Sequence, residues 1–153
     1  MSINETTLGK IGIFNTMIAS GPVIIQKRGG VESALLVKHG DKPIAELKWK
    51  FCGGKILLGM SFEENAVREA KEEIGVNVTL SMPLKPMILW NEVPETGSET
   101  PQAIVLIHYL ATINEEPVKG DEVLAMEWFA LDQLPTDVSP NVRPVIEEYL
   151  RNR

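Results

Sequence analysis

Short apolar runs, separated by turns rich in glycine and proline, recur along the chain and predict more strands than helices. Residues 23–25 and 34–37 flank a Lys-Arg-Gly-Gly turn and predict a hairpin. Residues 44–51 alternate between apolar and polar and predict a strand that leads into a glycine loop. Further strands are predicted at residues 76–80, 87–90, 103–111 and 122–129. The run at 103–111 is the most apolar, so we expect it to be central.

One segment has the period of a helix instead. Ser61 and Glu64 have the spacing of a capping box, and Gly75 provides a helix stop. The residues predicted to form the apolar face are Phe62, Ala66, Val67, Ala70 and Ile74. A second helix is predicted near the end of the chain, with Asn141 as its N-cap and Pro144 in its first turn.

The order of these elements is not a strict strand–helix alternation, which indicates an α+β fold or a mixed sheet between helices. A chain of 153 residues suits one globular domain. We place this domain at residues 20–153 and interpret residues 1–19 as an N-terminal strand or arm.

Composition excludes several classes of function. A net charge of −6 argues against nucleic-acid binding, and no apolar run is long enough to cross a membrane. The N-terminus lacks the features of a secretory signal. With a single cysteine, Cys52, no internal disulfide can form, and we expect a reducing, cytoplasmic location. We interpret Cys52 as a small packing residue and His108 as a packed, hydrogen-bonded histidine.

The polar face of the predicted helix carries candidate chemistry. Glu69, Glu72 and Glu73 lie at i, i+3 and i+4 and crowd one side of it. A divalent cation would relieve their repulsion, because hard oxygen ligands suit magnesium. Arg68 can hold one of the carboxylates in place. A solvated acidic face is the alternative, but the glycine loop at a fixed distance upstream favours a metal site.

This segment resembles the Nudix box, the pattern G-x5-E-x7-R-E-U-x-E-E-x-G-U in which U is a bulky aliphatic residue. Gly54 fills its first glycine, and the Arg-Glu pair, the Glu-Glu pair and the final Gly-Val fall on residues 68–69, 72–73 and 75–76. Ala70 is a mild departure at the first aliphatic position. The larger departure is Met60, which stands where the family has a glutamate that mostly braces the loop and the arginine.

The resemblance implies the Nudix fold, an α/β/α sandwich with a mixed central sheet, and a hydrolase of pyrophosphate bonds that depends on Mg²⁺, with Mn²⁺ as a substitute. The implied metal ligands are the Gly54 carbonyl and the carboxylates of Glu69, Glu72 and Glu73. The residues expected to take part in catalysis are Arg68, which would orient Glu69, together with Glu69, Glu72 and Glu122. The general base is either a box glutamate or one from a distant loop, namely Glu122, Glu95 or Glu99.

The sequence leaves the substrate open within one class. The partner is expected to be a small nucleotide, in which a nucleoside diphosphate is linked to another group. ADP-ribose-like compounds, nucleoside triphosphates and dinucleoside polyphosphates all fit. The expected substrate-binding residues are Gly53, Gly54, Lys55 and Trp90, with Phe51 and Tyr109 as other aromatics that could stack on a base. A non-catalytic regulatory module that binds nucleotides is the alternative, because Met60 departs from the motif.

We also predict a homodimer that uses residues 11–19. This segment carries Ile11, Ile13, Phe14, Met17 and Ile18, and so much apolar surface needs a cover on its own sheet or on a second subunit. Sedimentation of the full chain beside a version that lacks residues 1–19 tests this. A full chain that sediments as a monomer at micromolar concentration would assign the segment to its own sheet.

Overall fold

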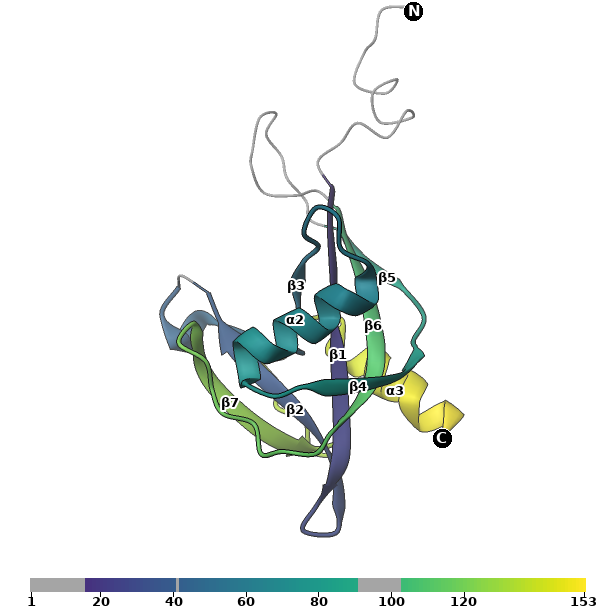
Figure 1. Ribbon diagram of the computed structural model, residues 1–153. Helices are drawn as coiled ribbons and strands as arrows, with labels where there is room; N and C mark the ends of the chain where they lie inside the picture. Colours follow the sequence, from purple (N-terminus) through teal and green to yellow (C-terminus); the bar gives the residue numbers. More distant parts are fainter. Residues whose placement is uncertain (1–15, 41, 91–102) are drawn as a thin grey trace, which may run out of the picture.

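The computed structural model describes residues 16–40, 42–90 and 103–153. Within them, seven strands form one mixed sheet with the order β4-β6-β1-β2-β7, to which β3 is added on β1 and β5 on β6 (Figure 1). The elements are β1 (Thr16–Arg28), β2 (Val31–His39), the 3-10 helix η1 (Ile44–Glu46), β3 (Gly54–Lys55), α2 (Phe62–Ile74), β4 (Val78–Pro83), β5 (Met87–Trp90), β6 (Ala103–Ile113), β7 (Val123–Ala130) and α3 (Val142–Asn152).

Strand β1 changes partners along its length. Its first part, residues 16–24, runs parallel to β6, whereas residues 25–28 pair with β2 in the antiparallel hairpin that the sequence predicted. Ala19 and Ser20 pair with β3. Strand β3 lies along the same edge of β1 that β2 occupies farther along the strand. The strand expected to be central, β6, is interior, because β1 lies on one side of it and β4 and β5 on the other. This mixed pairing brings the glycine loop to the middle of the sheet.

Helices cover both faces of the sheet, so the predicted α/β/α sandwich is confirmed (Figure 1). Alternate residues of β1 point to opposite faces, as the period of a strand requires. Ile24 belongs to the core beneath α2, where Ala70 and Ile74 pack. Val23 belongs to the core beneath α3, where Val145 packs. Each helix is therefore held by its own apolar core.

The strand predicted at residues 44–51 is wrong. The chain forms η1 there, followed by single bridges from Trp49 to Val138 and from Lys50 to Val37. The alternation arises because Trp49 packs edge-on against Phe129 in the core beneath α3, and no continuous strand edge runs beside it. Apolar residues at every second position show only that one side of the segment is buried. A loop that crosses a core produces the same pattern.

Helix α2 begins and ends as predicted. Ser61 and Glu64 form the capping box, and Gly75 ends the helix with φ 70°. The apolar face is displaced at its start, because Phe62 is 38% exposed while Ala66, Ala70 and Ile74 are buried. In α3 the predicted cap is only positional. Asn141 occupies the N-cap without capping the helix through its side chain, which instead contacts His108.

Residues 16–19 of the expected N-terminal arm form the start of β1 and pair with β6. Its remaining residues lie outside the described part of the chain. A truncation that tests the dimer must therefore end at residue 15 to spare the sheet. No helix among the described residues is long and apolar enough to cross a membrane.

Candidate active site

The glycine loop is seated directly on β1. A Cβ on Gly21 would lie 2.0 Å from the carbonyl oxygen of Cys52, so only glycine allows the two backbones to approach this closely. From there the chain continues into β3, where Gly54 pairs with Ser20. Cys52 is buried, as predicted, and burial raises the pKa of its thiol well above the usual value. The loop is thus fixed by the sheet rather than by its own side chains.

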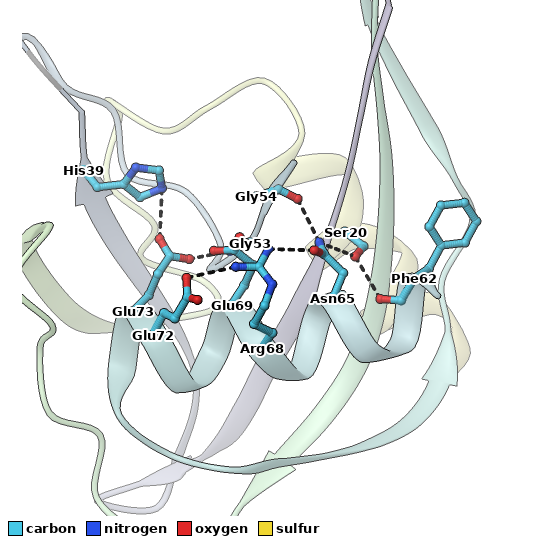
Figure 2. Close-up of polar contacts among 10 residues, drawn as sticks. All are labelled: Ser20, His39, Gly53, Gly54, Phe62, Asn65, Arg68, Glu69, Glu72 and Glu73. Carbon is cyan, nitrogen blue, oxygen red and sulfur yellow. Dashed lines mark hydrogen bonds and ion pairs between the residues drawn. The ribbon is translucent and has the colours of Figure 1, made fainter. Parts of the chain in front are cut away.

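Helix α2 presents its carboxylates to this loop through one arginine. Nη2 of Arg68 donates to Oε1 of Glu69 at 2.7 Å, and Nη1 donates to Oε2 of Glu72 at 3.0 Å (Figure 2). Glu69 lies so close to the loop that a Cβ on Gly54 would meet its Oε1 at 2.5 Å. Burial raises the pKa of Glu69, the charge of Arg68 opposes this shift, and Glu72 and Glu122 add to it. The predicted orienting role of Arg68 agrees with this geometry.

Glu73 is the most enclosed of the carboxylates, with 8% of its surface exposed. Its Oε1 accepts a hydrogen bond from the backbone N–H of Gly53 at 2.6 Å, and its Oε2 lies 3.0 Å from Nε2 of His39 (Figure 2). Burial raises the pKa of Glu73 to about 7. Burial and the charge of Lys50 lower the pKa of His39 to about 4. At neutral pH His39 is therefore neutral, so its contact with Glu73 is not an ion pair between opposite charges.

An open cavity of about 520 Å³ joins these groups. The residues that line it are His39, Gly53, Gly54, Glu69, Glu72, Glu73, Asp121 and Glu122. The sequence-predicted Glu122 is thus brought beside the box carboxylates from the loop before β7. That loop is anchored by Gly120, whose N–H donates to the carbonyl of Glu73 at 2.9 Å. The cavity is acidic on both sides, which suits a cation rather than a bare anion.

A second cavity of about 260 Å³ adjoins the acidic one, and the two share His39, Gly53 and Gly54. Its walls are largely apolar, and Phe51 is among them. His108 lines it as well, and its Nε2 lies 3.0 Å from the amide nitrogen of Asn141. His108 is packed and hydrogen-bonded as predicted, but its buried Nδ1 has no partner among the described residues. His108 thus lines the cavity with one buried nitrogen that has no partner among the described residues.

Other predicted residues fall in different places. Lys55 is exposed in β3. Trp90 is 65% exposed at the end of β5 and lines neither cavity as the described residues define them. Tyr109 is buried, and its hydroxyl donates to Glu63. Two candidate bases, Glu95 and Glu99, lie outside the described residues.

Sequence reasoning missed His39 as a site residue. A signal for it exists, because Leu35 and Val37 pack beneath α2 and His39 follows them with the period of two. The contact between His108 and Asn141 joins residues 33 positions apart and has no local signal.

The donor set fits a hard divalent cation in kind, since it consists of carboxylates and a backbone carbonyl. Glu69, Glu72 and Glu73 face one cavity, and burial and mutual repulsion raise the pKa of Glu69 and Glu73. Within the described residues, however, no three His, Cys, Asp or Glu side chains already form a group that could hold a metal. Arg68 engages Glu69 and Glu72, so these two would need to exchange that contact for the cation in order to bind it.

The chain is similar to a known family and to several known proteins. The model of the NUDIX domain family matches residues 16–149. A protein named putative 8-oxo-dGTP diphosphatase from Bacillus subtilis (strain 168) is 30% identical over 118 residues, which are 77% of this chain and 71% of that protein. The MutT NUDIX hydrolase from Burkholderia pseudomallei is 28% identical with a TM-score of 0.71, covering 87% of this chain and 97% of its own. An Ap4A hydrolase from C. elegans is 19% identical with a TM-score of 0.70, covering 89% and 96%, which shows the shared fold.

Fold and relatives together define a pyrophosphohydrolase, an enzyme that acts on acid anhydrides, as the sequence predicted. The chain belongs to the NUDIX family.

The raised pKa of Glu73 predicts a pH-dependent stability of the metal-free protein. Between its ordinary pKa of 4.5 and its folded value of about 7, Glu73 holds a proton when folded that it loses on unfolding. Its contribution to the free energy of unfolding should therefore fall as pH rises through this window, by roughly 3 kcal/mol at most. Urea unfolding in EDTA at pH 5 to 8 measures it.

Glu73→Gln is the comparison, because glutamine does not titrate. The lowered pKa of His39 acts in the opposite direction in both proteins, so the difference between the two curves isolates Glu73. Parallel curves for the two proteins would contradict the raised pKa.

Proposed function

We propose that this chain is a metal-dependent pyrophosphohydrolase of nucleotides, with a nucleoside triphosphate as its best substrate class. The observation that carries the proposal is the pair of adjoining cavities that share the Gly53–Gly54 loop. The acidic cavity suits a cation and the phosphates that it would carry. The apolar cavity, which Phe51 and His108 line, suits a flat base.

Glu69, Glu72, Glu73 and the Gly54 carbonyl are the proposed ligands of the cation. When bound, Mg²⁺ or Mn²⁺ would neutralise phosphate charge and lower the pKa of a bound water. Arg68 holds Glu69 and Glu72 before the cation arrives. The N–H of Gly53 fixes Glu73, and Gly54 leaves room for Glu69. The chain's own part in the reaction is thus to gather carboxylates around the place of the cation, where Arg68 must give up its contacts with Glu69 and Glu72 when the cation binds.

We assign the general base to Glu122, which faces the box carboxylates across the acidic cavity. Its charge contributes to the raised pKa of Glu69, so the two carboxylates sense each other. A base there could accept a proton from the water that attacks phosphorus, while the departing group leaves as a phosphate-containing fragment.

Among the three substrate classes, the relative from Bacillus subtilis supports a nucleoside triphosphate, since its name specifies 8-oxo-dGTP. The similarity to the C. elegans Ap4A hydrolase, at 19% identity, supports only the fold. ADP-ribose-like compounds and dinucleoside polyphosphates belong in the same assay. A metal-dependent hydrolysis assay across these compounds, in which the nucleotide products are separated by chromatography, tests the proposal directly. We further propose that the protein is a homodimer and that it acts in a reducing, cytoplasmic location.

Loss of a single carboxylate charge should lower kcat strongly without unfolding the protein. We expect Glu69→Gln and Glu73→Gln each to lower kcat by about two or more orders of magnitude, as for other lost charge-stabilising groups. Glu147→Gln, on the exposed side of α3, is the matched control and should turn over normally. Circular dichroism should show the same fold in all of them.

Near-normal turnover in both site variants would contradict the metal assignment. Nucleotide binding without metal-dependent turnover of any compound by the parent protein would instead favour the non-catalytic regulatory module.

His108, whose Nδ1 has no partner among the described residues, lines the apolar cavity and is predicted to favour substrates that carry a base. We expect His108→Phe to lower kcat/KM for the preferred nucleoside triphosphate by roughly tenfold, since a hydrogen bond contributes about 1 kcal/mol and leaving its partner unpaired costs more. Inorganic tripolyphosphate has no base, so any hydrolysis of it should not change. Equal losses on every base and on tripolyphosphate would show that His108 acts only in packing.

A further inference from the structure

Asn65 joins three parts of the site from a completely buried position on α2, where 0% of its surface is exposed. Its Nδ2 donates to the carbonyl oxygen of Gly54 and to Oγ of Ser20, both at 3.0 Å. Its Oδ1 accepts from Nη2 of Arg68 at 2.7 Å (Figure 2). One amide therefore ties the glycine loop, strand β1 and the site arginine together.

Two of these partners are functional groups of the site. The Gly54 carbonyl is the backbone oxygen proposed as a cation ligand. The same Nη2 of Arg68 that contacts Asn65 also donates to Oε1 of Glu69 at 2.7 Å. The third partner, Ser20, donates onward to the carbonyl of Phe62 at 2.8 Å and belongs to the joint between α2 and β1. Loss of the Asn65 amide would release a carbonyl ligand and the guanidinium that holds Glu69 at once.

We propose that Asn65 is the positioning residue of this site, which sets the Gly54 carbonyl and the Arg68–Glu69 pair relative to each other. The inference rests on the proposed metal-dependent function and deepens it. Asn65 is buried beneath these groups and acts through them. An asparagine is suited to this role because it offers two donors and an acceptor in one rigid plane.

Position 60 explains why this chain needs such a residue. The family motif has a glutamate there, whereas Met60 offers only a thioether, a weak acceptor. Nearby, Leu57 is 43% exposed and Leu58 is fully exposed, so these two leucines do not form a buried apolar seat for the loop. Asn65 contacts both the loop and Arg68. These are the two groups that a charged side chain at position 60 would otherwise have to contact.

Titration of the parent protein, Asn65→Ala and Asn65→Asp with Mn²⁺ alone tests the proposal without substrate. We expect both variants to raise the dissociation constant for Mn²⁺ by about tenfold or more, the range for lost partners of metal ligands. Asparagine and aspartate differ in one respect: Asn65→Asp keeps an acceptor for Arg68 but turns an oxygen toward the Gly54 carbonyl. The Arg68 guanidinium N–H signals in the NMR spectrum of the metal-free protein should therefore stay protected in Asn65→Asp and exchange faster in Asn65→Ala.

Ile74→Val is the control for a purely structural role of Asn65, because it shortens a buried side chain elsewhere on α2. Like the Asn65 variants it should lower the melting temperature, but its affinity for Mn²⁺ should stay within twofold of the parent. With the preferred nucleotide, the Asn65 variants should lower kcat about tenfold while KM changes by less than threefold. All measurements are made at a temperature where circular dichroism shows each variant to be folded.

Met60→Glu, added to Asn65→Ala, should recover at least threefold of the lost Mn²⁺ affinity, while alone in the parent protein it should be tolerated. Purely additive effects of the two substitutions would overturn the link between positions 60 and 65.

The proposal itself is overturned if Asn65→Ala leaves both Mn²⁺ affinity and the Arg68 signals unchanged. A parent protein that binds Mn²⁺ but hydrolyses no nucleotide would contradict the proposed function while leaving the Asn65 test intact. If the parent binds no Mn²⁺, the Arg68 signals of the metal-free variants still decide the Asn65 contact.

Discussion

The close contact between β1 and the Cys52–Gly53 backbone is the constraint on which the site depends. Because Gly21 has no side chain, the backbone of Cys52 and Gly53 can lie against β1. The residue that follows them, Gly54, then pairs with Ser20 in the sheet. Helix α2 packs over the same strand through Ala70 and Ile74. Loop and helix thus share one support, and the carboxylates meet the loop because both are fixed to β1.

This arrangement concentrates carboxylates at a site that is partly shielded from water. Burial, rather than any single neighbour, is the main cause of the raised pKa values of Glu69 and Glu73. The N–H of Gly53 and the guanidinium of Arg68 offset part of that cost. Carboxylates that are held away from water are stabilised when a cation binds to them. The packing of the fold keeps the carboxylates at the site.

The helix and its carboxylates could be predicted because their signals are local. A capping box, a period of 3.6 and a stop glycine all lie within residues 61–75. The segment at 44–51 misled because its alternation reflects the burial of Phe51 and the partial burial of Trp49 in a core rather than pairing in a sheet. Asn141 reaches the site through the start of α3, and such long-range placement leaves little trace in the sequence, whereas the alternation along β2 gives a signal for His39. Asn65 reads as one more polar helix residue until its partners are known.

The change of partners along β1 sets an order for folding. The β1–β2 hairpin closes over a few residues and can form early, whereas β1 meets β6 only across most of the chain, with Thr16 opposite Ala103. Non-local pairing of this kind is slow, because the entropy of closing the long loop is lost before its contacts form. On a ribosome, the residues of α2 emerge well before β6, the strand that completes the sheet on which α2 rests. The nascent chain therefore carries its whole motif for some time without a formed site.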